Sequence, residues 1–313
     1  METYLINYRD ESFKMPTLLE WNFSYGSALP CDAFEVCFIH DKSMTALLED
    51  AYRFRAVFEG KTVFFGVVDE FEVSASERGA VAWVRGRGLA ALLLDNEAEA
   101  AQYFSASLDT ILDKYVHPFG IRDIRRSVSP PVQSIVVNSG ASAWRVLEDF
   151  MWFGSGLVPR FSRDGVLLLG EEPGERIVIN ERTAVFLREY KRKRYGVISE
   201  VLVKNKAAGS VNRVENADFS SRGGRARRVV NVPRQTRFDA MRSTGEYQIQ
   251  RSMEDETRIS LTLYPLFAAF PGDVAEISDG VLGLGGRFAV RRTRCFGAAA
   301  GAGTEIILSR QVQ

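Results

Sequence analysis

Hydrophobic and polar side chains alternate along much of the first part of the chain. One run places Phe34, Val36 and Phe38 on a single face, and residues 52–68 form two more alternating runs joined by a turn. A period of two residues is typical of half-buried strands, and short strands at close spacing are typical of small barrels and sandwiches. We therefore predict that residues 1–95 form a small antiparallel β-barrel or β-sandwich domain.

The hydrophobic period then changes from 2 to 3.6 residues. Ser107 is a candidate N-cap for a helix with an apolar stripe, and a second helix is expected over residues 142–153 with Gly154 as its C-cap. A turn at residues 163–165 between two short apolar runs predicts a β-hairpin. Residues 96–175 are therefore expected to form a small α+β middle module.

The strand pattern returns from residue 176. Ile259, Leu261 and Leu263 alternate with polar residues, as in a strand. Residues 205–228, in contrast, have weak periodicity and many Gly, Ser, Asn and Arg residues, so we predict a long mobile loop there. The predicted fold class is α+β, mainly β. A second β-rich domain at residues 176–313 would follow the middle module.

The 40 basic and 40 acidic side chains of this 313-residue chain cancel, but they are unevenly distributed. Residues 186–242 contain 15 Lys and Arg against 5 Asp and Glu. Such a segment is either solvated or a docking surface for an acidic partner or nucleic acid. Six arginines in its two basic runs are the candidate partner contacts: Arg192, Arg194, Arg222, Arg225, Arg227 and Arg228.

Motifs for catalysis or cofactor binding are weak. The best is a GxGxxA pattern at residues 86–91, but a dinucleotide site would need a complete βαβ unit followed by an acid, and that context is missing. The two histidines, His40 and His117, lie far apart, and the three cysteines form no CxxC pair. We expect no catalytic residue, no metal, no cofactor and no enzyme activity.

The composition is typical of a globular protein, with 46% hydrophobic and 26% charged residues. The first residues lack the basic and apolar regions of a secretory signal, and no uncharged apolar run approaches the roughly 18 residues that span a bilayer. We expect a chain that is made in the cytoplasm and does not span a membrane.

Several short strings resemble, in this order, the baseplate hub proteins of contractile phage tails. That group includes the late control protein D family and the hubs of prophage tails and R-type bacteriocins. The strings lie at residues 58–69, 85–96, 142–150, 163–167, 270–273 and 286–290. The resemblance covers most of the chain and rests on the order of its modules.

This resemblance implies a mechanical function. Each hub chain has two barrels similar to tail-tube proteins, so a homotrimer presents six barrels and adapts the sixfold tail tube to the threefold central spike. It implies contacts with tube proteins, with the spike, and with tape measure and baseplate wedge proteins. The protein would be made in the bacterial cytoplasm and assembled in the baseplate of a phage tail or tail-like particle.

Two other functions stay open at the level of sequence. A nucleic-acid-binding protein would use the basic residues 186–242 and would bind DNA in a salt-dependent way, although we expect no specific nucleic acid. A tail-associated cell-wall hydrolase would need a cleft that holds a carboxyl group with a raised pKa.

Overall fold

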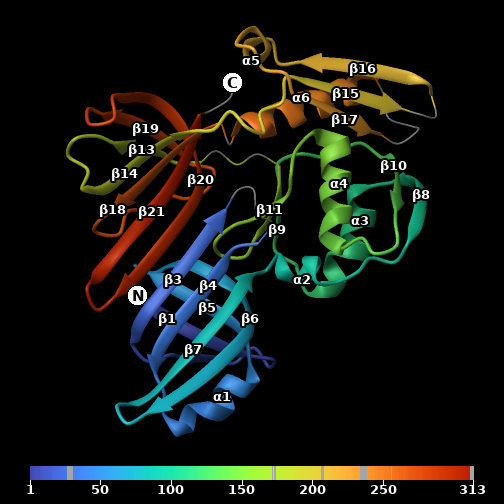
Figure 1. Ribbon diagram of the computed structural model, residues 1–313. Coiled ribbons are helices and arrows are strands. Elements are labelled where there is room, and N and C mark those ends of the chain that lie inside the picture. Colours follow the sequence, from blue (N-terminus) through green and yellow to red (C-terminus); the bar gives the residue numbers. More distant parts are fainter. Residues whose placement is uncertain are drawn as a thin grey trace. The chain divides into compact units, whose positions relative to one another are not determined.

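The computed structural model describes residues 1–26, 31–170, 172, 174–205, 208–232, 238–254 and 256–310. The chain forms two compact units (Figure 1). Unit 1 consists of Met1–Gly174, Leu263–Gly272 and Arg291–Ile306, and unit 2 of Glu175–Thr262, Asp273–Val290 and Ile307–Gln313. The division into three domains at residues 95 and 175 stays a prediction.

Unit 1 contains an antiparallel sheet with the strand order β20-β3-β4-β7-β6-β5-β1-β2. Its strands are β1 (Glu2–Asn7), β2 (Ser12–Lys14), β3 (Leu18–Gly26), β4 (Ala33–Ile39), β5 (Ala51–Phe58), β6 (Lys61–Ser76), β7 (Gly79–Gly88) and part of β20 (Leu284–Ala298). Short helix α1 (Thr45–Asp50) joins β4 to β5. The predicted strands around Phe34, Phe54 and Phe64 are confirmed, and these side chains are at most 3% exposed in one core.

The mainly β, α+β class is confirmed, but the predicted closed barrel is not observed in unit 1. Among the described residues, the hydrogen-bonded order ends at β2, so the sheet has an open edge there. β2 is only three residues long and pairs with β1 alone.

The remainder of unit 1 has its own core, built by three helices and two small sheets. The elements are α2 (Ala91–Leu94), β8 (Ala101–Ala106), α3 (Leu108–Tyr115), β9 (Ile124–Arg126), β10 (Gln133–Val137), α4 (Ala143–Ser155), β11 (Arg160–Phe161) and β12 (Leu167–Leu169). Strands β10 and β8 pair with each other, and β11, β12 and β9 form the second sheet. The buried faces of α3 and α4 contribute Ile111, Leu112, Leu147 and Phe150 to this core.

The predicted helix starts are confirmed by their caps. The hydroxyl groups of Ser107 and Ser142 each accept a hydrogen bond from the backbone N–H three residues later, at 3.2 Å. The predicted C-cap Gly154 was wrong. Helix α4 continues to Ser155, and Gly156 ends it with a φ of 73° in the left-handed region, where glycine has no steric penalty.

Unit 2 contains a second group of strands, in the order β14-β18-β21-β20, with β19 between β20 and β13. They are β13 (Arg176–Ile179), β14 (Val185–Arg192), β18 (Thr257–Leu263), β19 (Val274–Asp279) and parts of β20 and β21 (Gly301–Arg310). The predicted strand at Ile259, Leu261 and Leu263 is confirmed as β18. Strand β14 is at the end of this order, so one of its edges has no partner strand among the described residues.

A small three-stranded sheet in unit 2 replaces the predicted mobile loop at residues 205–228, and that prediction was wrong. Strand β15 (Glu200–Asn205) pairs with β16 (Ser210–Glu215) on one side and with β17 (Arg227–Asn231) on the other. Short helix α5 (Ala217–Ser221) connects β16 to β17. Helix α6 (Phe238–Glu254) contacts β15 and β16, and Val201, Val203 and Met241 are buried there.

Candidate interaction surface

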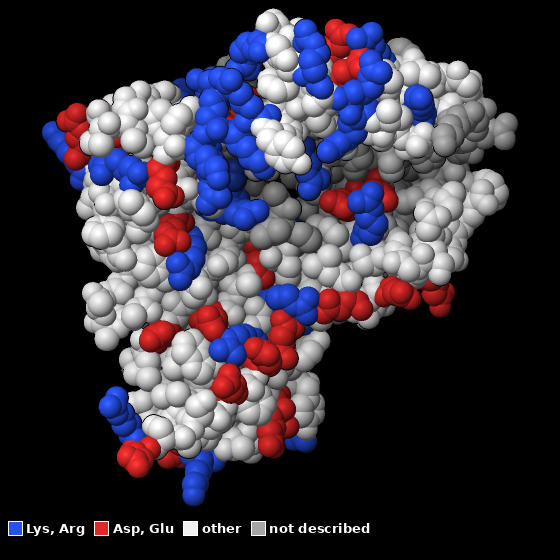
Figure 2. Space-filling view, viewed as in Figure 1, with Lys and Arg blue, Asp and Glu red and all other residues white. Residues whose placement is uncertain are grey.

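The basic residues of segment 186–242 gather on one face of unit 2. Figure 2 shows Lys and Arg side chains over α5 and the neighbouring strands of the small sheet. We call this the basic surface and define it by nine exposed side chains: Lys191, Arg192, Lys193, Arg194, Arg213, Arg222, Arg225, Arg227 and Arg228. It contains all six of the candidate contact residues.

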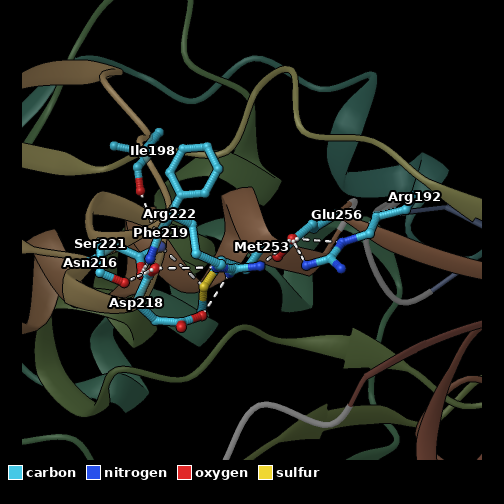
Figure 3. Close-up of polar contacts among 9 residues, drawn as sticks. All are labelled: Arg192, Ile198, Asn216, Asp218, Phe219, Ser221, Arg222, Met253 and Glu256. Atoms are coloured by element: carbon cyan, nitrogen blue, oxygen red, sulfur yellow. Dashed lines mark hydrogen bonds and ion pairs between the residues drawn. The ribbon is translucent and has the colours of Figure 1, made fainter.

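A buried asparagine fixes the position of helix α5 beneath this surface. The Asn216 side-chain oxygen accepts a hydrogen bond from the backbone N–H of Phe219 at 3.1 Å, which caps the helix. Its amide nitrogen donates to the carbonyl of Ile198 at 3.2 Å and contacts the Met253 sulfur at 3.2 Å (Figure 3). Asn216 therefore ties α5 both to the start of the small sheet and to α6.

Glu256 links two of the candidate arginines. Its Oε1 atom accepts hydrogen bonds from Arg192 Nε at 3.2 Å and Nη2 at 2.9 Å, and lies 3.5 Å from Nη1 of Arg222. Arg222 also forms an ion pair with Asp218 at 2.6 Å. Figure 3 shows these four side chains as one chain of alternating charges. The Glu256 side chain is only 12% exposed, so this carboxylate is held by its two arginines.

Glu200 likewise pairs with two arginines, in the small sheet. It lies directly opposite Arg227 of β17 in the strand register, and it forms ion pairs with both Arg227 and Arg213. The hydrogen bond from Arg227 is the main cause that lowers the pKa of the Glu200 carboxyl, and this carboxylate is therefore ionised at neutral pH.

The other three candidate arginines have different surroundings. Arg225 donates from Nη1 to the carbonyl oxygens of Ser220 and Gly224, at 3.1 and 2.7 Å. Arg228 donates from Nη1 to the Gln248 side-chain oxygen at 2.8 Å. Arg194 is exposed, and within the described part of the chain no carboxylate lies in ion-pair range of it.

These contacts offset part of the segment's charge within unit 2. Arg192, Arg222 and Arg227 pair with Glu256, Asp218 and Glu200, which are acids of the same unit. The acids themselves are visible in the sequence, but which arginine each acid meets depends on the tertiary structure. Whether the six arginines contact a partner stays a prediction.

Strand β14 adds aromatic and aliphatic side chains beside the basic surface. Phe186 is 79% exposed, Leu187 48% and Tyr190 47%, and Tyr195, just after the strand, is 86% exposed. A long edge strand with exposed hydrophobic side chains is a template for pairing with another chain. This edge is therefore the feature of unit 2 best suited to contact with a second protein.

The glycine pattern at residues 86–91 has a structural explanation. Gly86 lies inside β7, and a Cβ atom added there would be 2.0 Å from the carbonyl oxygen of Val67 and 2.6 Å from the Phe34 ring. Glycine is needed because the neighbouring strand approaches this closely. Strand β7 ends at Gly88, the second glycine of the pattern.

Within the described residues, no group of three or more His, Cys, Asp or Glu side chains is arranged to hold a metal ion. Cys31, Cys37 and Cys295 are free thiols, and burial raises the pKa of Cys31 to about 12 and that of Cys295 to about 11. These thiols are therefore poor nucleophiles at neutral pH. Among the described helices, none combines the length and apolar character needed to cross a bilayer.

Several solved structures have a similar fold. The tail protein of Neisseria meningitidis MC58 superposes with a TM-score of 0.81 at 15% identity, covering 99% of this chain and 96% of that one. The 43 kDa tail protein of prophage MuSo2 from Shewanella oneidensis gives a TM-score of 0.80 at 17% identity, with coverage of 99% and 98%. This chain has the fold of phage tail proteins.

A less similar structure comes from a bacterial secretion system. The E. coli c3393 protein is a component of the type VI secretion system with structural similarity to the T4 bacteriophage tail proteins gp27 and gp5. It gives a TM-score of 0.59 at 11% identity, covering 95% of this chain and 74% of its own. No family model and no curated protein sequence matches the chain.

Proposed function

We propose that this protein is the baseplate hub of a contractile phage tail or tail-like injection particle. In this proposal three copies form a ring, and each copy contributes two tube-like β regions. The six regions match the sixfold tail tube above, and the three copies match the threefold spike below. The observation that carries the proposal is the agreement in fold over nearly the whole chain with two tail proteins. The protein has no catalytic role in this proposal and contacts tube, spike, tape measure and wedge proteins.

The open strand edges support a ring. Among the described residues, unit 1 has an unpaired edge at β2 and unit 2 has one at β14. A contact between two different surfaces of the same chain is heterologous, and it closes into a ring when the rotation between copies allows it. Pairing such edges across copies would also protect them from aggregation.

Light scattering on the purified chain, alone and with its spike, tests the oligomeric state. We expect a mass of three times the 35.0 kDa chain in at least the sample with the spike. A strict monomer or dimer in both samples would refute the ring.

A pair of variants tests the role of the β14 edge. Leu187→Lys adds a charge to an exposed position on that strand, and it should weaken trimer formation at least tenfold while leaving the folded chain intact. Val281→Lys is the matched control, because Val281 is 76% exposed in a turn of the same unit and lies outside any strand. If both variants assemble like the wild type, β14 is not a subunit contact.

A further inference from the structure

Two arginines lie on one face of β5 in unit 1. Arg53 and Arg55 alternate with Phe54 and Ala56, which are fully buried in the sheet's core. Residues two apart on a strand point to the same side and are spaced by about 7 Å. Both arginines are partly buried, so their positions are set by the surrounding residues.

Aromatic rings hold both guanidinium groups. The guanidinium carbon of Arg55 lies 5.0 Å from the centre of the Tyr4 ring, and that of Arg53 lies 5.5 Å from Tyr52 and 5.9 Å from Phe65. Tyr4 and Phe65 are the residues directly opposite Arg55 on the two neighbouring strands. Such stacking orients the planar group and leaves its N–H donors available.

Within the described part of the chain, neither guanidinium group has an anionic partner. The Nε atoms of Arg53 and Arg55 are shielded from solvent and have no hydrogen-bond partner among these residues. No carboxylate of the described residues lies within ion-pair distance of either side chain. A shielded, unpaired donor is unfavourable, and it is uncommon in native proteins unless a ligand or partner completes it.

The same sheet contains a second pair of arginines with this spacing, and there the partners are present. Arg85 on β7 binds Glu35 at 2.6 Å and Glu70 at 3.1 Å. Arg87 binds Asp69 at 2.7 Å and Asp95 at 2.6 Å. Two arginines placed two residues apart on this sheet are thus suited to several carboxylates at once.

We propose that Arg53 and Arg55 form a binding site for an acidic segment of a partner protein. An extended segment with carboxylates two residues apart has the spacing of the two guanidinium groups, and each carboxylate can accept paired hydrogen bonds from one of them. Arg85 and Arg87, which have the same spacing on this sheet, bind carboxylates. The site is inferred from contacts within unit 1 and not from the hub proposal.

Binding of a labelled octapeptide of alternating Thr and Glu to the full chain tests the site. We expect the wild type to bind this peptide measurably by fluorescence anisotropy, and the variant Arg53→Met/Arg55→Met to bind it at least tenfold more weakly. A control peptide in which Gln replaces each Glu should bind the wild type at least tenfold more weakly. The control Lys191→Met/Arg194→Met removes two exposed cations of the basic surface and should change affinity less than twofold. The variant Arg53→Lys/Arg55→Lys keeps both charges but loses the paired hydrogen bonds of the guanidinium groups. It should bind the Thr–Glu peptide at least threefold more weakly than the wild type does.

Three results would overturn the proposal. The first is absence of binding by the wild type, and the second is an equal loss of affinity in the Arg53/Arg55 and Lys191/Arg194 variants. The third is displacement of the peptide by inorganic phosphate at equal concentration, which would mean a phosphate site. Thermal unfolding shows that each variant is folded, and the lysine variant decides the result if the methionine variant does not fold.

Discussion

Asp279 anchors the edge strand β14 to the body of unit 2, and replacing it tests that anchor. Its Oδ2 atom accepts from Arg188 Nε at 2.6 Å, and Oδ1 accepts from the backbone N–H groups of Val281 and Leu282 at 3.0 and 2.9 Å. Arg188 also donates to the carbonyl of Val185 at 2.9 Å. The Asp279 side chain is 8% exposed and that of Arg188 is 23% exposed.

Asp279→Asn keeps an acceptor for the turn but removes the charge that faces Arg188. A hydrogen bond between charged groups contributes about 1.5 to 3 kcal/mol, and the partial exposure of Arg188 favours the lower half of that range, about 1.5 to 2 kcal/mol. For a protein of this size the thermal midpoint should fall by about 2 to 3 °C at pH 7. Differential scanning calorimetry measures the shift.

The pH dependence of this variant has a definite sign. Burial by itself raises the pKa of Asp279, but the hydrogen bonds from Leu282 and Arg188 outweigh it and hold the pKa below its usual value. A lowered folded-state pKa stabilises the protein above the unfolded-state value, near 4, and that stabilisation is lost as the pH falls through the folded-state pKa. The difference between wild type and Asp279→Asn should therefore narrow between pH 5 and pH 3.

The matched control is Glu246→Gln, which breaks an exposed pair with Arg242 on α6. Exposed pairs contribute little, so its midpoint should change by less than about 1 °C. If Asp279→Asn shifts the midpoint no more than this control at pH 7, the argument that the buried pair anchors β14 is wrong.

Three further predictions concern single residues. Asn216→Ala removes the cap of α5 and should lower stability by about 1 kcal/mol, seen as a lower urea midpoint; an unchanged midpoint would mean that the cap contributes nothing. Asp32→Asn should stabilise the chain increasingly between pH 4 and pH 7, because burial raises the Asp32 pKa to about 7 and the wild type therefore loses stability over that range; a shift that is independent of pH would contradict this. Gly86→Ala places a Cβ atom 2.0 Å from the Val67 carbonyl oxygen and should prevent soluble expression, whereas a soluble variant with a wild-type midpoint would show that β6 can move away.

The strands and helices that the sequence predicted correctly are those whose pattern is local. Strand β4 alternates because one face is buried, and α3 and α4 begin at serine caps that act within three residues. Helix α6 was missed because its buried positions, Met241, Thr244, Gly245 and Ile249, are few and are interspersed with polar and charged residues. Its helical pattern was too weak to recognise.

The candidate surface could be predicted only in part. The local excess of cations was visible, but its pairing with acids was not. Glu256 lies 64 residues from Arg192, and Glu200 meets Arg227 through a parallel strand pairing. Strand β16 has one face open to solvent and Asn212 on its buried face, so its alternation is weak. Long-range pairing of this kind turns an apparent loop into a sheet.

The proposed ring of three copies between tail tube and spike can be observed in the particle itself. Cryo-electron microscopy of tail particles that carry a labelled copy of the chain provides this test. We predict label density with threefold symmetry, in a single ring between the tube and the spike. Six copies in that ring, or label elsewhere in the particle, would refute the proposal.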